Sequence, residues 1–289
     1  MGERESSVAN LESNLENDPS YLVAQEVAHR LTPIDNMFSE GKIDRDVYFT
    51  KIDSLKDKLL EQNEGYSEDQ SIIGLVCDSS LIIRSACQRF SREMKKSREN
   101  LALVEASWQI GLAEYFLEYE SQPATIPVVN LCLDRFNKTL KELHFDGEYA
   151  EGVVRGVKGL LATMNALKMN GHQIELPTSK QDAEGKVDLI SVDEEGRRYF
   201  WQIKTVVVDR KPSVIGIDRK QVDDPDNQEF VDLANTLLSS AQKAEAEDDL
   251  TTKAVYITIP EPQIGGKFGP RQSITNSIKE YLSTGDRYE

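Results

Sequence analysis

The chain has 289 residues, of which 39% are hydrophobic, and a formal net charge of −16 at pH 7. This length allows one large or two ordinary domains, and no stretch approaches the ~20 apolar residues that a membrane-spanning helix needs. The charged N-terminus lacks the apolar segment of a secretory signal, so we expect a cytoplasmic protein without a membrane anchor. Its three histidines and three cysteines lack metal-ligand spacing, so we expect neither a zinc site nor a Ser-His-Asp site.

The N-terminal half is predicted to be helical throughout, because its apolar residues recur at helical spacing. The order Asp18-Pro19-Ser20 is typical of a helix start. A charged patch at residues 92–100 predicts a break or an exposed turn within the longest helical stretch. The predicted helical segments are residues 21–31, 44–63 and 71–120.

Two prolines mark an expected domain boundary. Pro123 and Pro127 interrupt the helical pattern, and proline disrupts a helix interior. We therefore expect a helical domain over residues 1–122 and a second domain over residues 123–289. Residues 128–143 predict a further helix, which could belong to either half.

A helix predicted over residues 148–170 carries three polar side chains away from its apolar stripe. Glu151, Arg155 and Lys158 lie on this polar side, where Glu151 could also form an ordinary i,i+4 pair with Arg155. Glycines interrupt the helix and would allow it to approach a sheet closely. The buried stripe is Val153, Val154, Val157, Leu160, Leu161, Met164 and Leu167, and the glycines are Gly152, Gly156 and Gly159.

A β-hairpin follows, because two segments rich in β-branched and aromatic residues flank a polar turn that ends in glycine. The strands are residues 187–192 and 197–208, and the turn is residues 193–196. Before the hairpin, residues 172–177 predict a short strand and residues 178–185 a polar turn.

Three polar groups meet on this predicted hairpin. Folding about the turn sets Asp188 opposite Gln202 to within one residue, about 5 Å apart at Cβ. Lys204 lies two residues after Gln202, so both side chains share one face of the strand. Metal-dependent cleavage of a phosphodiester needs residues of these types close together. The alternative is a surface hairpin on which Lys204 merely neutralises Asp188.

The remaining segments predict a mixed sheet flanked by helices, an α+β or α/β fold. Residues 209–225 read as a long charged loop. Asp226 and Glu229 form a capping box for an amphipathic helix that ends near Glu247. Residues 252–259 predict a strong final strand.

The order of helix glutamate, strand, aspartate, hairpin and Gln-x-Lys resembles the PD-(D/E)xK nuclease superfamily. The segments carrying Glu151 and Asp188 are similar to archaeal Holliday-junction resolvases. Glutamine at position 202 resembles modified-DNA restriction endonucleases and transposon end-cleaving endonucleases. The resemblance covers roughly residues 147–260. It departs from the family pattern in two places, since Val187 replaces a proline and Gln202 replaces a charged ligand.

This resemblance implies a restriction-endonuclease-like sheet and Mg²⁺-dependent hydrolysis of DNA, with Mn²⁺ expected to substitute. Restriction, phage defence or mobile-element processing would be the setting. Asp188 would be the central metal ligand, and Lys204 would orient and activate the attacking water. Further ligands would be the amide oxygen of Gln202, the carbonyl of Ile203 and the carboxylate of Glu151. Asp182 is a weaker candidate ligand.

The charge distribution bears on the partners. Residues from 147 onward carry 18 Lys and Arg against 24 Asp and Glu, whereas the earlier residues carry 16 against 26. The helical half could position DNA, dimerise or dock a protein partner, and its acidity favours protein contacts over DNA contacts. Candidate contacts to DNA, with RNA as an alternative, are Arg155, Lys158, Lys267 and Arg271.

Two other interpretations stay open. The chain could be a non-catalytic scaffold that keeps the PD-(D/E)xK fold within a multi-subunit complex, which the neutral Gln202 and the acidic surface favour. It could also be an unrelated α/β domain with a helical partner, in which the polar cluster on the hairpin is coincidental.

Overall fold

The computed structural model has a mixed α+β fold, as expected, and divides into two compact units, Met1–Gly152 and Val153–Glu289. None of the described helices is long and apolar enough to cross a membrane. We refer to the two parts as the helical unit and the sheet unit. The structure describes residues 17–89, 94–144, 147–207, 211–217, 228–260 and 272–284.

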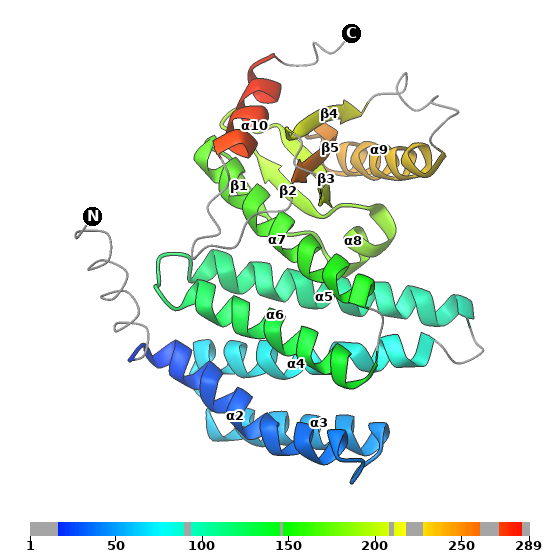
Figure 1. Cartoon of the computed structure of the whole chain (residues 1–289). Coiled ribbons are helices and arrows are strands. Elements are labelled where there is room, and N and C mark those ends of the chain that lie inside the picture. Colours follow the sequence, from blue (N-terminus) through cyan, green and yellow to red (C-terminus); the bar gives the residue numbers. More distant parts are fainter. Residues whose placement is uncertain are drawn as a thin grey trace. The chain divides into compact units, whose positions relative to one another are not determined.

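Helix α4 is the centre of the helical unit, because it packs against α2, α3, α5 and α6 (Figure 1). Aspartates begin two of these helices. Asp18 accepts hydrogen bonds from the first backbone N–H groups of α2, and Asp44 accepts one from Val47 of α3 at 2.8 Å. The helices are α2 (Pro19–Ser39), α3 (Arg45–Gln62), α4 (Ser67–Arg89), α5 (Met94–Glu118) and α6 (Thr125–Glu142).

Helix α6 belongs to the helical unit, so the compact units divide later than the expected boundary between residues 122 and 123. Its face carrying Cys132 and Phe136 is buried, and Phe136 stacks on Trp108 with ring centroids 5.1 Å apart. Pro123 precedes the helix and Pro127 lies in its first turn, where proline costs little. The two prolines therefore mark the start of a helix rather than the end of a unit.

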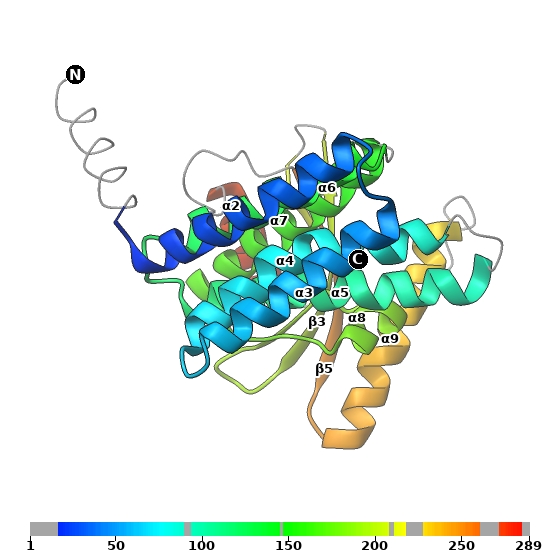
Figure 2. The ribbon, with the colours of Figure 1, turned by 90° about the horizontal axis from the view of Figure 1, so that it is seen from below.

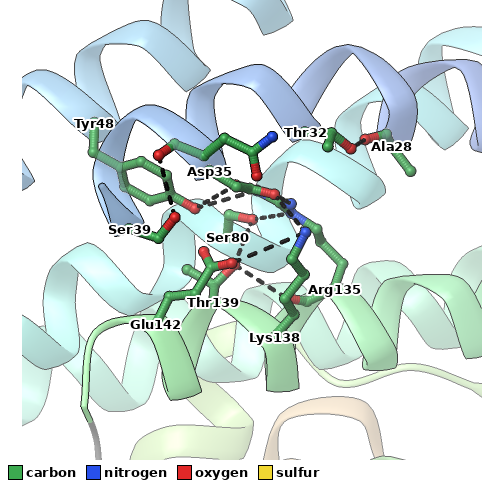
Figure 3. Close-up of polar contacts among 11 residues, drawn as sticks. Ala28, Thr32, Asp35, Ser39, Tyr48, Ser80, Arg135, Lys138, Thr139 and Glu142 are labelled. Atoms are coloured by element: carbon green, nitrogen blue, oxygen red, sulfur yellow. Dashed lines mark hydrogen bonds and ion pairs between the residues drawn. The ribbon is translucent and has the colours of Figure 1, made fainter. Parts of the chain in front are cut away.

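A buried ionic network joins α2, α3, α4 and α6 (Figure 3). Asp35 is fully buried and accepts from both terminal nitrogens of Arg135, from Lys138 Nζ at 3.0 Å and from the Tyr48 hydroxyl at 3.1 Å. Arg135 also donates to Ser80 at 2.6 Å. Burial alone would raise the pKa of Asp35, but the hydrogen bonds and charges of Arg135 and Lys138 outweigh it and lower the pKa.

The sheet unit contains a five-stranded mixed sheet in the order β1-β2-β3-β5-β4. Strands β3 and β5 are parallel, and the other neighbours are antiparallel. A crossover between parallel strands needs an intervening segment, which here contains β4 and α9. The elements are β1 (Gln173–Glu175), α8 (Ser179–Gly185), β2 (Leu189–Val192), β3 (Arg198–Val206), β4 (Ser213–Ile217), α9 (Gln228–Asp248), β5 (Thr252–Pro260) and α10 (Gln272–Thr284), preceded by α7 (Gly147–Met169), which begins before the division.

Helices α7 and α9 approach opposite faces of this sheet. Leu237 of α9 shares a buried cluster with Phe200 of β3, and Figure 2 shows α9 running beside β5. Gly159 of α7 lies against Thr205 of the same strand. Because successive strand residues point to alternate faces, Phe200 and Thr205 project to opposite sides.

The close approach of α7 requires glycine at position 159. An added Cβ would overlap the Thr205 hydroxyl and lie 3.4 Å from the Ile259 side chain. Thr205 is β-branched, so two of its three staggered rotamers place a heavy atom near this point. We expect Gly159→Ala to lower the free energy of unfolding by about 1–3 kcal/mol in urea titrations.

Gly156→Ala is the matched control for that substitution. Nothing lies within 4 Å of a Cβ at Gly156, so alanine should stabilise the helix there, by up to ~1 kcal/mol. Equal effects of the two substitutions would contradict the assignment of a packing role to Gly159.

Two segments differ from their predicted structure. Residues 178–185 were expected to be a polar turn, but they contain α8, because Thr178 and Gln181 form a reciprocal capping box. Residues 209–225 were expected to be a loop, but they contain β4, whose Val214 is buried where the strand pairs with β5. No element was predicted where α10 lies.

Other predictions depend partly on residues outside the described ranges. The charged patch at residues 92–100 was expected to be a break, but α5 is already helical from Met94. The interval between α4 and α5, residues 90–93, is outside the described part of the chain. Asp226 of the expected capping box is also outside it, whereas α9 itself is present.

Candidate functional site

The hairpin register confirms the predicted pairing of Asp188 with Gln202. Leu189 lies opposite Trp201 in the antiparallel β2–β3 pair. Asp188, the residue just before β2, therefore lies opposite Gln202 of β3. The backbone N–H of Asp188 donates to the carbonyl of Trp201 at 2.9 Å. The carboxylate is therefore placed at the end of β2 by the same ladder that forms the hairpin.

Asp188 and Gln202 are in direct contact. Gln202 Nε2 donates to Asp188 Oδ2 at 2.5 Å, and the backbone N–H of Ile203 donates to the same oxygen at 2.6 Å. The other amide atom, Gln202 Oε1, is buried and has no hydrogen-bond partner among the described residues. A buried acceptor without a donor carries a desolvation cost of about 1–3 kcal/mol, which a ligand at this point would relieve.

Lys204 lies two residues after Gln202 on the same face of β3, and its side chain is exposed. In the described part of the sheet unit, Lys204 forms no ion pair with Asp188 within 4.0 Å. The alternative in which Lys204 simply neutralises Asp188 is therefore not supported by a direct contact between the two side chains. The ammonium group is open to a ligand at the end of the hairpin.

Two carboxyl groups at this end of the sheet have raised pKa values. Burial and, secondarily, the charge of Asp182 raise the pKa of Asp188 to about 8, although the hydrogen bond from Ile203 and the charges of Lys186 and Lys204 act in the opposite direction. Burial also raises the pKa of Asp182 to about 6. Each of these two acids would be favoured in its charged state by a bound cation.

The other candidate residues lie on α7 or outside the described part of the chain. Glu151 is exposed on α7 and falls on the helical side of the unit division, so its role as a metal ligand stays a prediction. Arg155 and Lys158 are half-buried on α7. Lys267 and Arg271 lie outside the described residues.

The described residues contain no group of three or more His, Cys, Asp or Glu side chains that could hold a metal ion. The donor set on the hairpin is different, since it pairs one carboxylate, Asp188, with the amide oxygen of Gln202. Asp182 adds a second carboxylate nearby. Oxygen ligands of this kind match the preference of Mg²⁺, and the buried Gln202 Oε1 supplies a lone pair that no donor uses.

A buried Ser-His contact in the same unit is structural rather than catalytic. His172 Nδ1 lies 2.9 Å from Ser191 Oγ, which also accepts a hydrogen bond from Trp201 Nε1 at 2.8 Å. Ser191 is completely buried, so its hydroxyl is closed to a substrate. Cys77 and Cys132 are likewise buried free thiols, as expected, and burial raises the pKa of each to about 12.

The sequence did not predict a polar groove between α8 and α9, with a volume of about 620 Å³. Its lining does not include Asp188, Gln202 or Lys204. The capping pattern of Thr178 and Gln181 was the signal for α8 that could have indicated one wall. The lining residues are Thr178, Lys180, Gln181, Glu184, Gly185, Phe200, Asn235, Thr236, Ser239, Ser240, Lys243, Ala244 and Glu247.

Comparisons with known proteins add no relative. No family model matches the chain, and no curated protein and no solved structure matches it. The resemblance to PD-(D/E)xK nucleases therefore stays a prediction that rests on the residues of the hairpin and on the order of the elements around it.

Proposed function

We propose that this chain is a Mg²⁺-dependent endonuclease that hydrolyses phosphodiester bonds of DNA on a restriction-endonuclease-like sheet. The observation that carries the proposal is the contact between Asp188 and Gln202, with one amide oxygen buried and unused and Lys204 exposed on the same strand face. A carboxylate, an amide oxygen and an ammonium group at one hairpin end are suited to hold a hard cation beside a phosphate.

The donor set determines which residues would hold the metal. Asp188 and Gln202 Oε1 would bind it, and the carbonyl of Ile203 is a further proposed ligand. Bound Mg²⁺ supplies positive charge that stabilises the negative charge developing on the phosphate oxygens. The N–H of Ile203 already holds Asp188 Oδ2, which keeps the carboxylate oriented before any ligand arrives.

Lys204 would act on the attacking water and on the phosphate. Its ammonium group is exposed two residues beyond Gln202, so it can reach a phosphate that contacts both side chains. Backbone pairing with β5 on one side and the hairpin on the other fixes the strand that carries it. A cation carried on this fixed strand would stabilise the charge that develops on the phosphate.

The order of the elements supports the proposal at the level of the fold. A helix, an antiparallel β1-β2-β3 meander, a segment containing α9 and the parallel strand β5 make up a mixed α+β unit. This element order is compatible with the core that the family resemblance implies. Restriction, phage defence or mobile-element processing would be the biological setting. The acidic helical unit would then dock a protein partner or a second copy of the chain.

A non-catalytic scaffold with the same fold is the second candidate, and one observation favours it. Asp188 Oδ2 is occupied by two hydrogen bonds, from Gln202 and from Ile203, and the neutral amide replaces a charged ligand. A site closed in this way would bind metal weakly. Metal titration separates the two candidates, because an active nuclease should bind Mg²⁺ or Mn²⁺ through Asp188 and a scaffold should not.

Cleavage of plasmid and oligonucleotide substrates tests the proposal directly. Each substrate is incubated with the purified full chain in Mg²⁺, in Mn²⁺ and in EDTA. We expect products with either metal and none in EDTA. Absence of cleavage across DNA and RNA substrates, together with no Mn²⁺ binding that depends on Asp188, would leave the scaffold as the better candidate.

A further inference from the structure

The groove between α8 and α9 adjoins the candidate site on the same face of the sheet. Phe200 forms part of the groove and lies two residues before Gln202 on β3, so both side chains project to one face. Two residues along a strand span about 7 Å. Helix α8 also joins the two regions, because it carries Asp182, which acts on the pKa of Asp188, between the groove residues Gln181 and Glu184.

The groove offers hydrogen-bonding groups and cations alongside its apolar surface. Hydroxyl or amide groups come from both walls, among them Thr178 and Gln181 from the α8 side and Asn235 and Ser239 from α9. Ser240 is occupied, since its hydroxyl bonds to the carbonyl of Gly185 at 3.1 Å and holds the two walls together. Side chains of these types are the ones that contact phosphate and sugar oxygens in complexes with nucleic acids.

Two lysines of the groove are held only loosely. Lys180 Nζ lies 3.8 Å from Glu184 and Lys243 Nζ lies 3.9 Å from Glu247, both beyond hydrogen-bonding distance. The four side chains are mostly exposed, so these pairs contribute little to stability and can separate. The negative charges of Glu184 and Glu247 repel an anion. The exposed side chains of Lys180 and Lys243 can rotate away from these glutamates and towards the anion.

We infer that this groove holds the phosphate backbone of the nucleic-acid strand next to the bond that is cleaved, an inference that rests on the proposed endonuclease function. The only aromatic residue in its lining, Phe200, is 2% exposed, so the groove provides no stacking surface for bases. The groove therefore contacts the backbone without reading the sequence.

The test uses the full chain carrying Asp188→Asn, which should bind a substrate without cutting it. Binding of a fluorescein-labelled DNA duplex is measured by anisotropy over a series of salt concentrations. Adding Lys180→Gln and Lys243→Gln should weaken binding about tenfold near ~0.1 M salt, and should reduce the slope of log K against log salt by about 2. The matched control is Lys279→Gln on α10, an exposed lysine outside the groove, which should change neither quantity.

Three outcomes distinguish this inference from the proposed function. Equal losses for two unrelated DNA sequences, and for an RNA duplex if the chain binds RNA, support a contact to the backbone. Cleavage by the wild-type chain together with unchanged binding by the double lysine variant overturns the inferred role of the groove. The proposed endonuclease function then still stands. Failure of the wild-type chain to bind or cut any nucleic acid overturns both.

Discussion

Substitution of Lys204 by alanine is expected to reduce the rate of Mg²⁺-dependent DNA cleavage on the order of 10³-fold, and Asp188→Asn by at least as much. Lys204 would lose the charge placed beside the phosphate. Asp188→Asn keeps an oxygen that can accept from Ile203, but it removes the negative charge that would bind the metal. Single-turnover cleavage of a labelled duplex measures both losses.

The fold should survive these substitutions, so lost activity will report on chemistry. Lys204 is exposed and makes no ion pair with Asp188, and its removal should change the free energy of unfolding by less than ~0.5 kcal/mol. Lys279→Ala is the matched control, because it removes an exposed lysine of the same unit from a helix far along the chain. Cleavage at the wild-type rate by Lys204→Ala would refute the assigned role.

Asp35→Ala should lower the free energy of unfolding by about 3–5 kcal/mol, the largest stability effect that we expect in the helical unit. The substitution leaves Arg135 buried and charged, and it removes the acceptor for Lys138 and Tyr48 as well (Figure 3). Unfolding in urea, followed by circular dichroism, measures the loss. The reason for its size is the unpaired buried guanidinium rather than the strength of the original pair.

A surface ion pair of the same unit supplies the comparison. Arg84 and Asp53 lie 2.5 Å apart, but their side chains are 39% and 43% exposed, so Asp53→Ala should cost only about 0–1 kcal/mol. Combining Asp35→Ala with Arg135→Ala should cost less than the sum of the single changes, because the second removes the charge that the first leaves unpaired. Additive losses would show that the two residues do not act as one buried pair.

The stabilisation from Asp35 should also depend on pH. Because the folded-state pKa of Asp35 is lowered below its ordinary value of about 3.9, its contribution is complete above that value. It should be lost as the pH falls through the lower folded-state pKa. The difference in unfolding free energy between the wild-type chain and Asp35→Ala should therefore be constant near neutral pH and should shrink in acid. A difference that persists unchanged in strong acid would exclude this linkage.

The hairpin was the most predictable part of the chain. Its two strands are local in sequence, their β-branched and aromatic residues favour extended backbone, and a four-residue polar turn limits the register. Spacing from this turn is therefore enough to set Asp188 opposite Gln202, and the observed register agrees. Close approach to the sheet was predicted for Gly152, Gly156 and Gly159 alike, but an added Cβ would meet neighbouring atoms only at Gly159 of these three.

Other elements depended on partners distant in the chain. Strand β4 is short, lies in a charged segment and is stabilised by pairing with β5, about forty residues later, so its own sequence resembled a loop. Helix α6 belongs to the helical unit because its apolar face packs against α2 and α4. The positions of Pro123 and Pro127 in the sequence do not indicate this packing. Asp35 and Arg135 are separated by 100 positions, and neither residue shows its partner in the sequence.

The sequence alone determined the class of the fold, the hairpin and the position of Asp188 opposite Gln202, because local propensity and a tight turn set these features. Only the tertiary structure decided that the amide oxygen of Gln202 stays without a hydrogen-bond partner among the described residues, that burial raises the pKa of Asp188, and that a groove lies between α8 and α9 beside the candidate site. Desolvation and long-range packing depend on atoms that are far apart along the chain, so periodicity and spacing carry no record of them.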